Sequence, residues 1–412
     1  MLTQSEPAAP QAKLLLWASL LLAALAIGYA ASRLRGVAHL TSTGVGPAPQ
    51  ETHAGVVTGP WGTLECTHIA IENPDEFISL NHSLTEPAIW YFEGYSPQRL
   101  TELLRSADLK PEERAALMDT NQWKKEDNAI CLSPSKELIL GLSAPARQQL
   151  YSVLAEDPRN HYQFAAYRYR SDGFQEWFDQ SGLTPDVLAS VKRLLYRWGP
   201  SICFSDLTEL LPTISSVDQQ RRLLKTLSRV STLVARLHVE PGADVEGLVR
   251  YWGKQGHAKD IRPLLQSLEN VPGGTDLDIA HLLPPFARMR LYTYPFPSED
   301  PLAPHRDCFW SAMNFFNETP DDRFCDFEHT KEVIRSDYYP IQGDPSYGDV
   351  IWLIAANGRA IHAAVYLAGD IVFTKNGVHF DRPWVLMHFP DMLALFPSRE
   401  PLRTVAYRLK TS

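Results

Sequence analysis

A cluster of prolines divides this chain into two parts of different character. Six of them fall within a short interval: Pro284, Pro285, Pro295, Pro297, Pro301 and Pro304. Because proline lacks a backbone N–H and clashes with the preceding turn, this interval cannot be a regular helix. The sequence before it is helical in pattern, and the sequence after it is strand-like. Single hydrophobic cores stop growing near about 250 to 300 residues, so a chain of 412 residues should fold as two units.

The composition is that of a folded protein without a nucleic-acid or metal site. Hydrophobic residues make up 44% of the chain and charged residues 21%, which provides enough apolar surface to offset the entropy of ordering. Lysine and arginine number 39 against 48 acidic residues, and without a basic stripe we expect no nucleic-acid partner. The five cysteines form no C-x-x-C pair. We therefore expect no metal, no cofactor and no disulfide framework, although one bridge between Cys66 and Cys131 stays open.

An uncharged segment near the N-terminus predicts a membrane helix. Residues 14–32 carry no charge, and at about 1.5 Å per residue they nearly span a bilayer core. We expect residues 1–35 to form an uncleaved anchor; a signal peptide ending at the small residues Gly28 and Ala30 is the alternative. Two arginines follow the segment and one lysine precedes it, which by the positive-inside rule favours a cytoplasmic body. Residues 36–60, rich in Gly, Pro, Thr and Ala, are expected to be a flexible linker.

Residues 61–272 are expected to form a mainly α-helical domain. The longest helical pattern covers residues 218–238, where apolar residues recur three and four positions apart. This apolar face is expected to be core and consists of Leu223, Leu224, Leu227, Val230, Leu233, Val234 and Leu237. No internal repeat is visible, so a solenoid is not expected.

The C-terminal part, residues 273–412, contains a cysteine at an expected helix start. Asp307 and Cys308 follow the proline-rich interval and open an amphipathic aromatic segment. Backbone N–H groups at a helix start stabilise a thiolate, which lowers the pKa of the thiol from about 8.5, and they can also bind an oxyanion. Cys308 is therefore a candidate nucleophile. Taken alone, however, a cysteine in such a segment is more often a small core residue.

A run of expected strands follows, and it carries the second candidate residue. A Gly-Asp turn at Asp349 precedes an apolar strand, and Asn357 with the glycine after it is typical of a hairpin turn. His362 lies near the start of the second strand, and a third strand begins at Ile371. We expect three antiparallel strands behind one helix. Taken alone, His362 is more often a hydrogen-bonded core histidine than a catalytic base.

The order of these motifs resembles the NlpC/P60 family of papain-like cysteine peptidases and amidases. Asp-Cys at a helix start, Gly-Asp before a strand and His-x-x-x-Tyr-Leu opening the next fall within about residues 287–408. The resemblance implies an α+β domain in which a helix packs on a small antiparallel sheet. It also implies that Cys308 attacks an amide carbonyl, that His362 removes the thiol proton, and that a polar residue on the following strand orients the imidazole.

The third catalytic position departs from the family pattern. Counting from His362 leads to Thr374, where the family usually has His, Asn or Gln, and a hydroxyl orients an imidazole less firmly than an amide does. Asn376 stands two residues further on, hence on the same face of the strand. The sequence leaves Thr374 and Asn376 as alternatives. Asp349 is expected to shape the strand entry rather than to act in catalysis.

Three functions are compatible with these residues. The resemblance implies first a membrane-anchored bacterial hydrolase whose body lies outside the cytoplasm, in the cell envelope, and which cleaves amide bonds of cell-wall peptidoglycan stem peptides. A transglutaminase-like or acyl-transferring enzyme with the same Cys–His chemistry is the second. The third is a domain that has lost turnover and serves as a binding or scaffold module for the helical part. The expected partners are a cell-wall peptide or another amide substrate and the membrane, and protein partners are left open.

Overall fold

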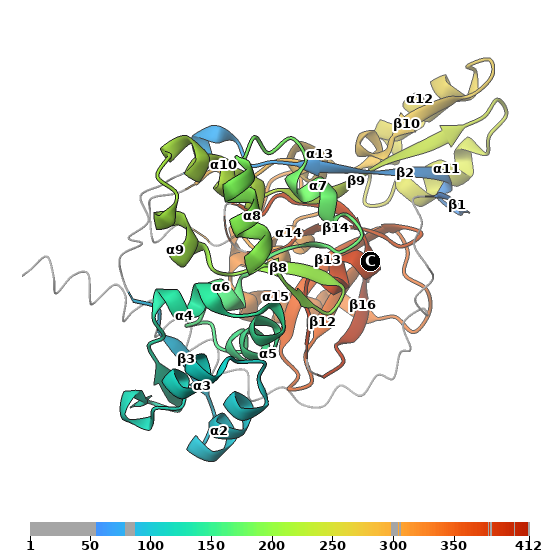
Figure 1. The fold of residues 1–412 in the computed structure, drawn as a ribbon. Helices are drawn as coiled ribbons and strands as arrows, with labels where there is room; N and C mark the ends of the chain where they lie inside the picture. The colour runs from blue at the N-terminus through green and yellow to red at the C-terminus, as the bar shows by residue number, and fades with distance from the viewer. Residues whose placement is uncertain are drawn as a thin grey trace, which may run out of the picture.

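The computed structural model describes residues 55–78, 87–297, 304, 306–377, 379, 381–398 and 400–410 of the chain. It is a mixed α+β structure with several antiparallel sheets. Figure 1 shows a lobe of short helices and strands beside a body built on the C-terminal sheet, from which a second sheet projects.

The C-terminal body is built on a six-stranded antiparallel sheet with the strand order β11-β16-β12-β13-β14-β15. Its strands are β11 (Tyr338–Pro340), β12 (Val350–Ile354), β13 (Ala360–Ala368), β14 (Ile371–Lys375), β15 (Trp384–His388) and β16 (Arg403–Leu409). Strands β12, β13 and β14 form consecutive hairpins, the three-strand arrangement that the sequence predicts. The first of their turns holds Gly358 at φ 82°, a conformation that glycine adopts without strain.

Side chains alternate between the two faces of this sheet, and each face has its own core. One face, called here the helix face, packs against α14 (Cys308–Met313) and carries Trp352, Ala363, Val365 and Phe373. The other, called here the lobe face, packs against α16 (Phe389–Ala394) and the residues after it and carries Leu353, Ala364, Tyr366 and Val372. The sheet therefore separates the two cores.

A second antiparallel sheet joins the body beside β15. Its strands in spatial order are β1 (Val56–Gly59), β2 (Gly62–Ile71), β9 (Val230–Val239) and β10 (Thr275–Asp278). The helices of the rest of the body are α11 (Val245–Trp252), α12 (Ala258–Glu269), α13 (Pro285–Arg290) and α15 (Phe327–Asp337). Leu265 and Leu277 both lie in the core of the helix face. That core therefore continues across the domain boundary expected near residue 272.

The lobe, residues 90–227, contains two three-stranded sheets as well as helices. Its strands are β3 (Trp90–Glu93), β4 (Lys124–Glu126), β5 (Ala129–Leu132), β6 (Tyr167–Arg170), β7 (Tyr196–Trp198) and β8 (Ser201–Phe204). Its helices are α2 (Pro97–Ser106), α3 (Pro111–Leu117), α4 (Lys136–Gly141), α5 (Ala144–Leu154), α6 (His161–Phe164), α7 (Phe174–Phe178), α8 (Pro185–Leu194), α9 (Leu207–Leu210) and α10 (Val217–Leu227). Residues 61–272 therefore combine helices with sheets, in the same mixed α+β character as the rest of the structure.

The predicted helix over residues 218–238 was wrong in its second half. Helix α10 ends at Leu227, and strand β9 begins at Val230. In β9 every second residue from Leu233 onward is buried, because the strand pairs with β2 on one side and β10 on the other. Branched side chains such as Val230 favour this extended structure. The apolar positions fit both the helical period and the strand period. Pairing with β2 and β10, which are distant in the sequence or follow later, decides in favour of a strand.

The membrane helix that belongs to the predicted fold class is not supported by the structure. In the part of the chain that the structure describes, no helix is long and apolar enough to cross a membrane. The segment on which the prediction rested, residues 14–32, lies outside the described residues. The fold supported by the structure is a mixed α+β arrangement of antiparallel sheets and short helices.

Candidate functional site

Cys308 occupies the first turn of α14, as the sequence predicts. Asp307 is the N-cap of this helix, and its Oδ1 accepts a hydrogen bond of 2.9 Å from the backbone N–H of Trp310. Trp310 is fully buried, and it fixes the helix against the sheet. The cap and the aromatic residues therefore explain why the helix begins at this position.

The thiol of Cys308 is not activated by this position. Its side chain is buried, and burial together with the nearby Asp307 carboxylate raises the pKa of the thiol well above its ordinary range, although the backbone N–H of Ala363 and the Lys375 ammonium act in the opposite direction. Desolvation of the charged form outweighs the favourable helix start. Near neutral pH Cys308 is therefore a neutral thiol rather than the thiolate that nucleophilic attack requires.

Lys375 is a buried residue whose ammonium group acts on this thiol. Its side chain is fully buried, and Nζ donates hydrogen bonds to the carbonyls of Gly377 at 2.5 Å and His379 at 3.1 Å. Burial lowers the pKa of Lys375 to about 8, while Cys308 and Asp307 oppose this shift. The sequence analysis missed Lys375, although a lysine inside an otherwise apolar strand is a signal that could have marked it.

His362 lies on the lobe face. Its Nε2 shares a hydrogen bond of 2.8 Å with Thr374 Oγ1, and its ring stacks on Phe396 with the ring centroids 4.2 Å apart. Burial lowers the pKa of His362 to about 3, so the imidazole is neutral across the physiological range. It is held between a hydroxyl and an aromatic ring.

The structure does not bring Cys308 and His362 together. The backbone N–H of Ala363 faces Cys308, and Ala363 belongs to the same core as the helix α14. His362 precedes Ala363 in the strand, so its side chain points to the other face. There its stacking partner Phe396 packs against the core of the lobe face. The sheet therefore stands between the expected nucleophile and the expected base.

The alternatives for the third position both lie on the face of His362. Thr374 contacts the imidazole directly. Asn376 lies one step behind, with Oδ1 3.4 Å from Thr374 Oγ1 and Nδ2 3.0 Å from Met387 Sδ. Of the two residues, Thr374 is the one that orients His362. Neither lies on the face of Cys308.

The other residues singled out in the sequence have structural surroundings. Asp349 is buried and forms a two-pronged ion pair with Arg408, at 2.9 and 2.6 Å. Cys66 and Cys131 are free thiols, so the bridge between them that the sequence left open is absent. Within the described residues, no three His, Cys, Asp or Glu side chains are placed to hold a metal ion.

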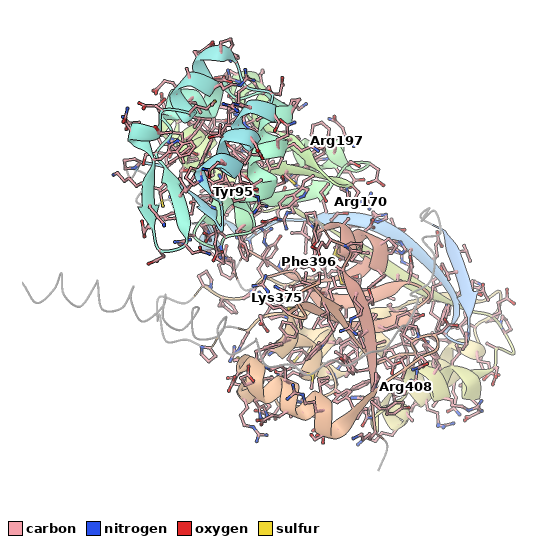
Figure 2. All side chains as sticks on the ribbon, turned by 90° about the horizontal axis from the view of Figure 1, so that it is seen from below. Tyr95, Arg170, Arg197, Lys375, Phe396 and Arg408 are labelled. Carbon is pink, nitrogen blue, oxygen red and sulfur yellow. The ribbon has the colours of Figure 1, made fainter. Side chains whose placement is uncertain are left out.

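The lobe docks on the segment that covers His362. Arg168 of β6 donates a 2.6 Å hydrogen bond to the carbonyl of Leu395, and Ser201 of β8 donates one of 3.1 Å to the carbonyl of Ala394. Phe396 follows directly and lies at the junction of the two bodies, with Arg170 on the lobe side (Figure 2). Sequence reasoning missed these residues, because the partners stand about two hundred positions apart in the chain and no local motif marks them.

Comparison with known proteins gives no relative from which a function could be transferred. No family model, no curated protein and no solved structure matches this chain.

Proposed function

We propose that the C-terminal body is a non-catalytic module of the NlpC/P60-like kind that serves as a scaffold for the lobe. One observation carries the proposal: Cys308 and His362 lie on opposite faces of the sheet. General-base activation of a thiol requires hydrogen-bond distance between the two groups. A six-stranded sheet between them removes that possibility.

The protonation of both groups supports the same proposal. The pKa of Cys308 is raised and the pKa of His362 is lowered, in each case mainly by burial. Both groups are therefore neutral near pH 7, and neither carries the charge that a thiolate and imidazolium pair would have. The position of His362 fits a packing role, because Thr374 and Phe396 occupy its polar edge and its ring face.

The lobe face of the sheet is the side on which the body holds the lobe. The face that carries His362 is covered by α16 and the residues after it, and the lobe is attached there through Arg168 and Ser201. A second attachment is Arg229, which lies outside the lobe, pairs with Glu72 and donates a 3.1 Å hydrogen bond to the carbonyl of Trp177 in the lobe. The body thus holds the lobe at several points rather than at a flexible joint.

Alkylation of the cysteines tests this proposal. With iodoacetamide at pH 7 and peptide mapping of the full chain, the half-buried Cys325 should be labelled first. Cys308 should be labelled as slowly as the buried Cys203, because a neutral buried thiol is a poor nucleophile. Labelling of Cys308 ahead of Cys325 would contradict the scaffold. The Cys308→Ala variant is the control that assigns the labelled peptide.

The competing proposal is a cysteine hydrolase acting on amide bonds, with peptidoglycan stem peptides as the implied substrate. Its one favourable observation is Lys375, a cation near the thiol that opposes the rise in the pKa of Cys308. The Cys308→Ala variant also tests it. Release of amines from stem peptides by the unmodified chain, abolished in the variant, would establish the enzyme and overturn the scaffold.

A further inference from the structure

A small cleft lies between the lobe and the C-terminal body, and neither Cys308 nor His362 lines it. It encloses about 110 Å³, well below the roughly 300 to 1,000 Å³ of sites for large ligands. Its polar lining comes from the segment after β2, from α6 and β6 of the lobe, and from the loop between β14 and β15, and includes Asn73, His161, Tyr167, His379, Asp381 and Arg382. Its size fits a small ligand rather than a drug-sized one.

Two buried acceptor atoms of this cleft lack a hydrogen-bond partner among the described residues. Asn73 is 1% exposed, and its Oδ1 is unpaired. Asp381 Oδ1 also accepts no hydrogen bond; it forms an ion pair with Arg382 Nε at 3.7 Å, which is longer than a hydrogen bond. Buried polar atoms are nearly always paired in folded proteins. The two oxygens therefore call for a ligand that brings N–H donors.

The cleft also offers a cation of its own. The guanidinium of Arg382 lies 5.7 Å from the centre of the Tyr167 ring, and in the described part of the chain its side chain donates to no acceptor within hydrogen-bond distance. A guanidinium matches a carboxylate in shape and charge. His161 and His379 stand beside it with ring centroids 5.2 Å apart. One carboxylate and one guanidinium balance each other, so a ligand with both charges leaves the site neutral.

Another part of the cleft wall is apolar. Phe77, Ile78 and Leu224 line it, and burying a short hydrocarbon side chain there is favourable. We propose that the cleft binds a free α-amino acid with an apolar side chain. Asp381 and Asn73 accept from its ammonium group, and Arg382 binds its carboxylate. This inference rests on the proposed scaffold function, because the cleft exists only while the body holds the lobe.

Calorimetric titration of the full chain with L-leucine tests the inference. Three probes each lack one feature: 4-methylpentanoate has no ammonium group, 3-methylbutan-1-amine has no carboxylate, and glycine has no side chain. L-leucine should bind, and each of the three should bind at least about tenfold more weakly, because a charged hydrogen-bonding partner is lost or apolar contact disappears. Equal binding of all four compounds, or binding of none, would overturn the inference without any variant.

Variants place the binding in the cleft. Asp381→Asn and Arg382→Gln should each weaken L-leucine binding about tenfold or more, with an unchanged melting temperature in the absence of leucine. Asp344→Asn and Arg359→Gln make the same changes at exposed positions outside the cleft and should leave binding intact. Unchanged affinity in both cleft variants would overturn the site. If leucine fails to bind while Cys308 stays inert to iodoacetamide, this inference alone falls; a reactive Cys308 removes the scaffold whatever leucine does.

Discussion

The two faces of the C-terminal sheet treat a buried polar group differently. On the helix face, the chain satisfies Lys375 with its own carbonyls, those of Gly377 and His379. On the lobe face, His362 is held by Thr374 and by the ring of Phe396. The polar group on the first face is satisfied by nearby chain, whereas the second face is covered by α16 and the residues after it, on which the lobe docks. The comparison teaches that position in a strand, and not residue type, decides whether a histidine meets a cysteine.

Removing the histidine should have the largest effect. His362→Ala leaves a cavity beside Phe396 and takes the partner of Thr374 away, so we expect the free energy of unfolding to fall by about 2 to 4 kcal/mol. Urea unfolding of the variant measures this. A loss below about 0.5 kcal/mol would mean that the lobe face does not depend on the imidazole.

Cutting the attachment of the lobe comes next. Arg168→Met keeps the apolar stem and removes the donor to the carbonyl of Leu395, leaving a partly buried acceptor unpaired at a cost of about 1 to 3 kcal/mol. Limited proteolysis of the full chain should then cleave more rapidly between the lobe and the body. Arg359→Gln, exposed and away from the interface, is the control that should not change the pattern.

The pH dependence of stability should separate the two faces. The pKa of His362 is lowered from 6.5 to about 3, so the unfolded chain binds the extra proton between these values, and stability falls as pH drops from 6.5 toward 3. The limiting slope is about 1.4 kcal/mol per pH unit. The difference in urea unfolding between the unmodified chain and His362→Gln isolates the contribution of His362 to this slope. Identical slopes in this window would show that the imidazole is not held neutral.

Lys375 should act in a different window. Burial lowers the pKa of its ammonium from 10.5 to about 8, so the unfolded chain binds more protons between pH 8 and 10.5, and this residue's contribution to stability rises with pH there. Lys375→Met should remove that rise, by up to about 1.4 kcal/mol per pH unit, and leave the acidic window unchanged. A variant that alters both windows would indicate that the two faces are coupled.

Removing the cysteine should have the smallest effect. Cys308→Ala deletes one buried free thiol, and we expect a loss of about 1 kcal/mol or less in the free energy of unfolding. The rate of limited proteolysis between the lobe and the body, which reports docking of the lobe, should be unchanged. A loss comparable with that of His362→Ala would reverse the comparison between the faces.

Local patterns in the sequence predicted the local parts of this structure. The helix start at Cys308 and the hairpin at Gly358 follow from residues a few positions apart. The face of His362 does not, because alternation places its side chain opposite that of Ala363, but only the packing of α14 on the sheet decides which of the two faces holds Cys308. The contacts of Phe396 and Arg168 join distant parts of the chain, so the hydrophobic periodicity of the sequence does not predict them.

The pairing of β2 with β9 has a consequence for the architecture. Ile71 lies opposite Val230 at the end of the ladder, so the chain leaves the body and returns to it at neighbouring points. The entropy of closing a loop grows only with the logarithm of its length. Each doubling of the length of the excursion from this ribbon costs only about 0.6 kcal/mol more. The body can therefore carry the lobe as an insert between β2 and β9. A different insert between these two strands would leave their pairing register unchanged.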